Sequence, residues 1–179
     1  NRNLQMAKTS LSKDEMRRAY MERGKLYQQQ GDLVEAGKTF ARCRDFVNTA
    51  AQSAEVSLAI AVTGLDIYNY SLAQQWIGKI DVNLGGAYRN KCRAIVGIIL
   101  MNDGDFKGAA RNFLDIDAGI IDTFREVISA EDVATYGVLC TIATASFVEV
   151  QNLCQSKHRF KPLLELVPDL RLVLQNYSP

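Results

Sequence analysis

The sequence predicts an all-α fold, a TPR-like superhelix built as a right-handed solenoid of helix pairs. The first observation is a repeated pattern, in which a small residue, a turn, an alanine and an apolar residue follow one another. Its anchoring alanines, Ala36, Ala73 and Ala109, lie 37 and then 36 residues apart, a period typical of helix-pair repeats. The second is that all three prolines lie beyond residue 161, which leaves the rest of the chain without its strongest helix breaker.

The first repeat is expected to start at a capping box. Ser12 and Glu15 have the Ser-x-x-Glu spacing that caps a helix N-terminus. Gly31 and Asp32 then mark the turn between two helices. Residues 1–11 are polar and are expected to be frayed, so the predicted repeat domain covers residues 12–179. The helix pairs are predicted at 12–30 with 33–46, at 51–68 with 71–80, and at 87–102 with 106–116.

Small and aromatic residues are expected to pack the helices of each pair together. Gly24 and Ala36 are predicted to face each other where the helices approach closely, with aromatic rings filling the space around them. The predicted repeat-packing residues are Gly24, Tyr27, Ala36, Phe40, Ala73, Gly97, Ala109 and Phe113.

The pattern loosens after the third pair. Residues 81–86 are predicted to form a loop, and residues 117–129 a linking segment with a short helix at 121–127. Residues 129–132 resemble another helix start, and Pro168 is suited to the first turn of the last predicted helix. Helices are predicted at 133–145, 148–155, 160–166 and 168–175.

The first helix of each pair is expected to line an inner groove. Its positions form a mixed, wettable face in the first repeat and apolar faces in the next two, and exposed apolar grooves are rare on monomers. Either another helix of the same chain fills this groove, which is favoured, or a partner does. Trp76 is favoured as a packing residue, with partner anchoring as the alternative. The predicted partner-binding residues are Arg18, Lys25, Trp76, Leu58, Val62 and Ile98.

Composition gives no support to a catalyst. The chain has 179 residues, and 21 basic against 20 acidic side chains leave a net charge of +1, so no global field attracts nucleic acid or membranes. The four cysteines are scattered, which favours buried free thiols in the cytosol or nucleus over a zinc site. His158 lies in a basic run and is favoured as a solvated residue. We therefore expect no catalytic, metal-binding or cofactor-binding residues.

Membrane and nucleic-acid partners are also disfavoured. The longest apolar stretch, residues 94–101, is too short to cross a bilayer. Basic side chains gather between Lys8 and Lys25, but Glu15 and Glu22 interrupt them, so a solvated helix face is favoured over a nucleic-acid site.

Two late segments resemble a known family. Residues 129–144 read Ser-Ala-Glu-Asp-Val-Ala-Thr-Tyr-Gly-Val-Leu-Cys-Thr-Ile-Ala-Thr, and residues 160–168 read Phe-Lys-Pro-Leu-Leu-Glu-Leu-Val-Pro. Both resemble segments of the COP9 signalosome subunit 1 family, as do Gly31-Asp32 and the Arg-Cys-Arg-Asp run at residues 42–45. The equivalent subunit of the 26S proteasome lid shares the repeats, but Tyr136, Gly137 and Cys140 look closer to the signalosome.

The resemblance implies a non-catalytic scaffold in a complex that removes Nedd8 from cullin-RING ubiquitin ligases. It implies the N-terminal repeat part of a longer protein, without the winged-helix PCI domain that follows in the family. Implied partners are other signalosome subunits and cullin-RING ligase components, in the nucleus and cytoplasm. Alternatives are the scaffold subunit of the proteasome lid and a free peptide-binding repeat module, against which the apolar groove positions argue. The repeats are expected to melt as one cooperative unit.

Overall fold

The computed structural model describes residues 13–117, 124–125, 127–146, 148–150 and 161–177, and all the regular elements assigned within them are helical. The all-α prediction is therefore confirmed. The helices are α2 (Lys13–Gln29), α3 (Leu33–Cys43), α4 (Ala50–Asp66), α5 (Tyr70–Ile77), α6 (Gly86–Asn102), α7 (Phe106–Leu114), α9 (Ala130–Thr144), α11 (Lys161–Leu166) and α12 (Pro168–Asn176), with short 3-10 turns η1 (Arg44–Phe46) and η2 (Val82–Leu84).

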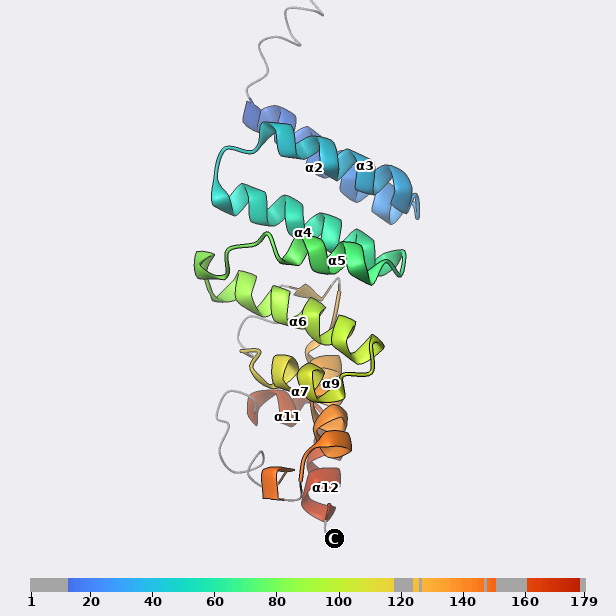
Figure 1. The fold of residues 1–179 in the computed structure, drawn as a ribbon, viewed down its shortest axis with the longest axis vertical. Coiled ribbons are helices and arrows are strands. Elements are labelled where there is room, and N and C mark those ends of the chain that lie inside the picture. The colour runs from blue at the N-terminus through green and yellow to red at the C-terminus, as the bar shows by residue number, and fades with distance from the viewer. Residues whose placement is uncertain (1–12, 118–123, 126, 147, 151–160, 178–179) are drawn as a thin grey trace, which may run out of the picture. The chain divides into compact units, whose positions relative to one another are not determined.

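The chain divides into two compact units, Asn1–Leu84 and Gly85–Pro179. The predicted repeat domain, residues 12–179, spans both units, and a continuous right-handed superhelix through all repeats stays a prediction. In unit 1, α2 pairs with α3 and α4 pairs with α5, while α3 also packs against α4 (Figure 1). Unit 1 is therefore a stack of two helix pairs, as the repeat pattern predicts.

Each helix pair is joined by the same kind of tight turn. At the turn, Gly31, Tyr68 and Gly104 have φ angles of 79°, 57° and 81°, so all three lie in the left-handed region that favours glycine. These residues occupy equivalent positions in the three repeats. Their backbone bonds also correspond, since the amide after each one donates to a carbonyl five residues earlier, at 2.9, 2.7 and 2.9 Å.

The residue after each left-handed position caps the second helix of its pair. The side chains of Asp32, Asn69 and Asp105 accept hydrogen bonds from backbone amides three residues further on. A short side-chain oxygen at the N-cap satisfies an amide that the helix leaves unpaired. The turns therefore end one helix and begin the next with only three residues between them.

Glycine against an aromatic ring holds the first pair of each unit together. A Cβ atom at Gly24 would lie 2.6 and 2.7 Å from carbons of the Phe40 ring, and one at Gly97 would lie 2.7 Å from the Phe113 ring. Both rings are fully buried. The nearest atoms to Gly24 thus belong to Phe40 and not to Ala36, which corrects the expectation that Gly24 faces Ala36.

The anchoring alanines are buried in every repeat. Ala36, Ala73 and Ala109 are inaccessible to solvent. In the second repeat the close approach falls at Ala73 itself, since a Cβ atom at Gly64 would lie 3.0 Å from its backbone nitrogen. Tyr27 is only partly buried, and its hydroxyl accepts a hydrogen bond of 2.9 Å from Arg23.

Unit 2 contains the third helix pair and the helices that follow it. α6 packs against α7, α9 packs against α7, and α11 and α12 both contact α9 (Figure 1). Ser129 caps α9 by accepting from the Asp132 amide at 3.0 Å, and proline occupies the first turn of α12. The helix predicted at 148–155 is described only at residues 148–150, which are helical. Its remaining residues fall outside the described ones, as do most of the helix predicted at 121–127 and Ser12 of the predicted capping box.

Candidate interaction surface

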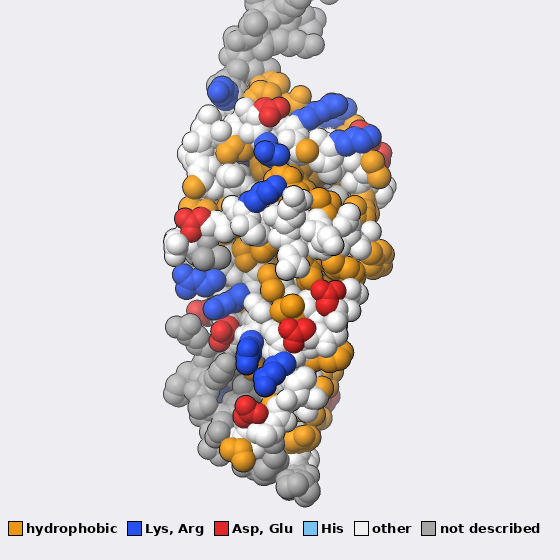
Figure 2. Space-filling model, viewed as in Figure 1, with side chains coloured by type: hydrophobic (Ala, Val, Ile, Leu, Met, Phe, Trp, Pro, Cys, Tyr) orange, Lys and Arg blue, Asp and Glu red, His pale blue; other side chains and the backbone are white. Residues whose placement is uncertain are grey.

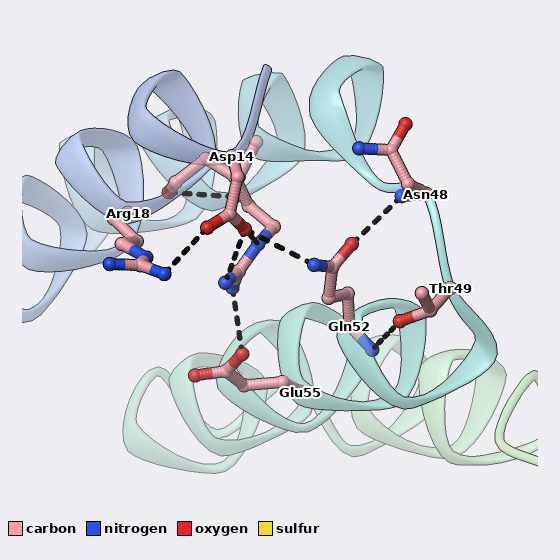
Figure 3. A network of polar contacts seen from close by, with 8 residues as sticks. Asp14, Arg18, Asn48, Thr49, Gln52 and Glu55 are labelled. Atoms are coloured by element: carbon pink, nitrogen blue, oxygen red, sulfur yellow. Dashed lines mark hydrogen bonds and ion pairs between the residues drawn. The ribbon is translucent and has the colours of Figure 1, made fainter. Parts of the chain in front are cut away.

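A buried arginine joins the first helices of the two pairs in unit 1. Arg17 on α2 donates to the Glu55 carboxylate on α4 at 2.9 Å and to the Asp14 carboxylate at 3.1 and 3.2 Å (Figure 3). Only 9% of Arg17 is exposed. A buried charge needs such partners, because leaving it unpaired is strongly destabilising.

Asp14 is the centre of this polar cluster. Its carboxylate also accepts from the Gln52 amide at 3.2 Å and forms an ion pair with Arg18 at 2.7 Å. The hydrogen bond from Arg17 lowers the pKa of Asp14 below its usual value near 3.8. We call Asp14, Arg17, Gln52 and Glu55 the polar clamp, since these four residues connect α2 with the first turns of α4 (Figure 3).

A second polar contact connects the other ends of the same two helices. The Gln28 amide donates to the Thr63 hydroxyl at 3.1 Å, and that hydroxyl donates to the Ala59 carbonyl at 2.9 Å. α2 and α4 are therefore joined near both ends. Gln28 and Glu55, which counting along the repeats places on the groove face, are engaged by contacts within unit 1.

The predicted partner-binding residues differ widely in exposure. Arg18 and Lys25 are exposed, and Val62 and Ile98 are half-buried. Leu58 is buried, with 7% of its surface exposed, which agrees with the favoured alternative that the chain itself fills the groove at this position. Ile98 belongs to unit 2 and the other predicted residues to unit 1, and their contact with a partner stays a prediction.

Trp76 is shielded by cations of its own chain. The residue is 8% exposed, with the Lys79 ammonium 3.6 Å and the Arg44 guanidinium 5.2 Å from the centre of its ring. A cation over an indole face is attracted by the negative face of the ring. The burial supports the packing role that was favoured, and it corrects the alternative in which Trp76 is an exposed anchor.

Exposed apolar side chains gather at the turns of unit 1. They are Leu26, Val34, Ile67 and Tyr68, of which Tyr68 is 80% exposed. The first two flank the α2–α3 turn, and the last two form the α4–α5 turn. We call these four residues the turn edge. Sequence reasoning missed both Arg17 and Tyr68, although the alignment of Tyr68 with Gly31 and Gly104 was visible in the repeat.

The described cysteines behave as packing residues. Cys43, Cys92 and Cys140 are free and buried, and burial raises the pKa of Cys92 to about 11. In the parts of the chain that the structure describes, no group of histidine, cysteine and acidic residues is placed to hold a metal ion. No helix there is long and apolar enough to cross a membrane. Cys154 and His158 lie outside the described residues.

The segment that carries the family resemblance is part of the core of unit 2. On α9, Val133, Ala134 and Val138 are fully buried, and Cys140 is 4% exposed. The Tyr136 ring lies 6.1 Å from that of Phe113 on α7, centre to centre. The resemblance at this segment thus reflects a packing interface between α9 and the third repeat.

Comparison with known proteins shows the family. The model of the family described as 26S proteasome subunit RPN7 matches residues 1–153. This chain belongs to the RPN7 family. The match covers both helix pairs of unit 1 as well as α6, α7 and α9 of unit 2.

Curated relatives of this RPN7-family chain carry the name COP9 signalosome complex subunit 1. The Arabidopsis thaliana protein is 28% identical over 173 residues, which is 95% of this chain and 39% of the relative. The Emericella nidulans protein is 30% identical over 92% of this chain and 34% of the relative. Subunit 1b of Drosophila melanogaster is 28% identical over 93% of this chain and 33% of the relative. The chain thus spans between a third and two fifths of their lengths.

Proposed function

We propose that this chain is the N-terminal helical-repeat arm of a COP9 signalosome subunit 1 and acts as a non-catalytic scaffold. The observation that carries the proposal is the similarity to relatives of that name over more than nine tenths of the chain. The helix pairs and the α9 packing interface lie within this similarity. Scaffolding is the usual role of helix-pair repeats, because they present extended surfaces to other proteins.

The proposed partners are other signalosome subunits and, through the complex, components of cullin-RING ubiquitin ligases. In this role the chain would support removal of Nedd8 from cullins by positioning proteins and not by chemistry of its own. Two kinds of contact support such a role: the polar clamp joins α2 to α4 between pairs, and the buried Phe40 and Phe113 rings pack against glycines within pairs. The proposed location is the nucleus and cytoplasm, which a fluorescent tag on the natural gene would test.

A second candidate is the scaffold subunit of the proteasome lid. The family description names that complex, so the observation that favours it is independent of the curated relatives. Affinity capture of the tagged gene product from its own cells, followed by mass spectrometry, separates the two candidates. Signalosome subunits and cullins are expected. Proteasome lid subunits would replace the first proposal with the second, and the absence of both sets would overturn both.

A further inference from the structure

Tyr68 occupies a backbone position that the other two repeats reserve for glycine. Its φ of 57° matches the 79° and 81° of Gly31 and Gly104, and its turn makes the same backbone hydrogen bonds. A side chain in this left-handed conformation is strained, and an aromatic one more so than asparagine. Strain of this kind persists where something compensates for it, commonly a functional contact.

The described part of unit 1 provides little such compensation for the Tyr68 side chain. Four fifths of the residue faces solvent. The backbone strain at Tyr68 therefore accompanies a phenol ring that is exposed and not packed in the core. Tyrosine is among the residues that most often anchor a protein interface, because it offers a large rigid apolar surface and one hydrogen-bonding group.

Three neighbouring apolar residues are also exposed and, with Tyr68, form the apolar surface of the turn edge. Leu26 and Val34 are 51% and 63% exposed, and Ile67 is 39% exposed. The Gln28–Thr63 hydrogen bond of 3.1 Å holds the C-terminal ends of α2 and α4 together, so the two turns that carry these residues are adjacent. Hydrophobic side chains are visible along the side of unit 1 where these turns lie, at the right in Figure 2.

The charges at the turn edge indicate the chemistry of what covers it. In residues 26–34 the only charged side chain is Asp32, and in residues 63–69 it is Asp66. Both are carboxylates on exposed residues, and partial burial raises the pKa of the Asp66 carboxyl. A basic group from a partner would be attracted to these two carboxylates. The nearest cations in the sequence, Arg23 and Lys25, precede the first turn on α2, and Arg23 is engaged by Tyr27.

We propose that the turn edge, with Tyr68 as its anchor, docks a segment of another subunit that carries apolar side chains next to lysine or arginine. This inference rests on the proposed function, because it takes the partner from the same complex. The partner segment buries the Tyr68 ring against its apolar side chains and pairs its basic group with Asp66 or Asp32.

The deciding experiment places a photo-crosslinking residue at the anchor. The tagged protein carrying Tyr68→p-benzoylphenylalanine is expressed in its own cells, irradiated and captured, and the crosslinked peptide is sequenced. The same residue at Gln75, exposed on α5, is the control position. The expected product joins residue 68 to an apolar, basic segment of another signalosome subunit, with no such product from position 75.

A second variant separates docking from folding. Tyr68→Gly removes the ring and relieves the strain, so the unfolding midpoint of the chain should rise by about 2–4 °C. Retention of the variant by the other subunits should nevertheless fall roughly ten-fold or more. Leu172→Ala, which removes an exposed apolar residue elsewhere (55% exposed), should leave retention unchanged.

The outcomes distinguish the inference from the proposed function. If the wild-type protein captures no signalosome subunit, the proposed function fails, and the assigned partner fails with it. If signalosome subunits are captured but residue 68 crosslinks to none of them, or only to a second copy of this chain, the docking inference alone is overturned. Unchanged retention of Tyr68→Gly would also overturn it.

Discussion

Gly24 and Gly97 show how single residues set the distance between paired helices. Each lies against the ring of the phenylalanine sixteen residues later, where any Cβ atom would overlap the ring carbons. Gly31 and Gly104 serve the backbone instead, since they provide positive φ angles at turns. The same residue type therefore does two physically different things within one repeat.

Alanine at either close-approach glycine is expected to destabilise its unit. Gly24→Ala and Gly97→Ala should each cost about 1–3 kcal/mol, because the buried ring must shift within a packed core. Thermal unfolding followed by circular dichroism measures the effect. Gly37→Ala is the matched control, since a Cβ atom there would meet only Thr63 at 3.8 Å, and it should stabilise by up to about 1 kcal/mol. Equal effects at both kinds of site would contradict the packing account.

The Asp14 carboxylate is expected to make the stability of the folded protein depend on pH in the acidic range. Its pKa is lowered in the folded protein, chiefly by the Arg17 hydrogen bond, so its contribution is present above the ordinary value near 3.8 and disappears as pH falls through the folded value. Asp14→Asn should therefore lower the unfolding midpoint at pH 7, and the difference from the wild type should shrink as the pH falls below the ordinary value near 3.8. Asp103→Asn, at an exposed residue in the α6–α7 turn, is the control. A midpoint difference that persists in acid would contradict this assignment.

At the scale of the helices, the helix starts could be predicted from the sequence where an N-cap residue marks them. Asp32, Asn69, Asp105 and Ser129 each accept from the amide three residues on, and the helices they begin were predicted to within about three residues. Local capping chemistry is visible in a single sequence because both partners lie within one turn.

Removal of the α9 cap is expected to weaken unit 2. Ser129→Ala deletes the acceptor of the 3.0 Å bond from the Asp132 amide and should cost about 1 kcal/mol, or about 2–4 °C in the unfolding midpoint. Ser129→Asp keeps an acceptor at the same place and should restore most of the loss. Failure of aspartate to restore stability would show that Ser129 matters for packing and not for capping.

Contacts between residues far apart in the sequence could not be predicted as well as the helix caps. Arg17 and Glu55 are 38 residues apart, and nothing local marks Arg17 as the cation that becomes buried. Counting along its helix places Leu58 on the groove face, but its burial depends on what the rest of the fold puts beside it. Burial of Trp76 under Arg44 and Lys79 has the same origin. Periodicity gives the face of a helix, whereas tertiary packing decides what covers that face.

At the scale of the whole molecule, the open question is whether the two compact units unfold together. Buried thiols provide a direct measurement, because Cys43 lies in unit 1 while Cys92 and Cys140 lie in unit 2. In the Cys154→Ser background, alkylation of all three at pH 8 should be slow in the native state and should rise at one common denaturant midpoint. Burial raises the pKa of each thiol, so native reactivity is low. Separate midpoints for Cys43 and the other two would contradict one cooperative unit.

The chain has one tryptophan, and its position gives the molecule a built-in optical probe. Trp76 is shielded from water and lies beside two cations, so its indole should emit at short wavelength and resist collisional quenchers in the native state. Because α5 belongs to unit 1, the emission is a signal from that unit, whereas far-ultraviolet circular dichroism averages over every helix. A titration followed in both signals thus compares half of the molecule with the whole, without any label.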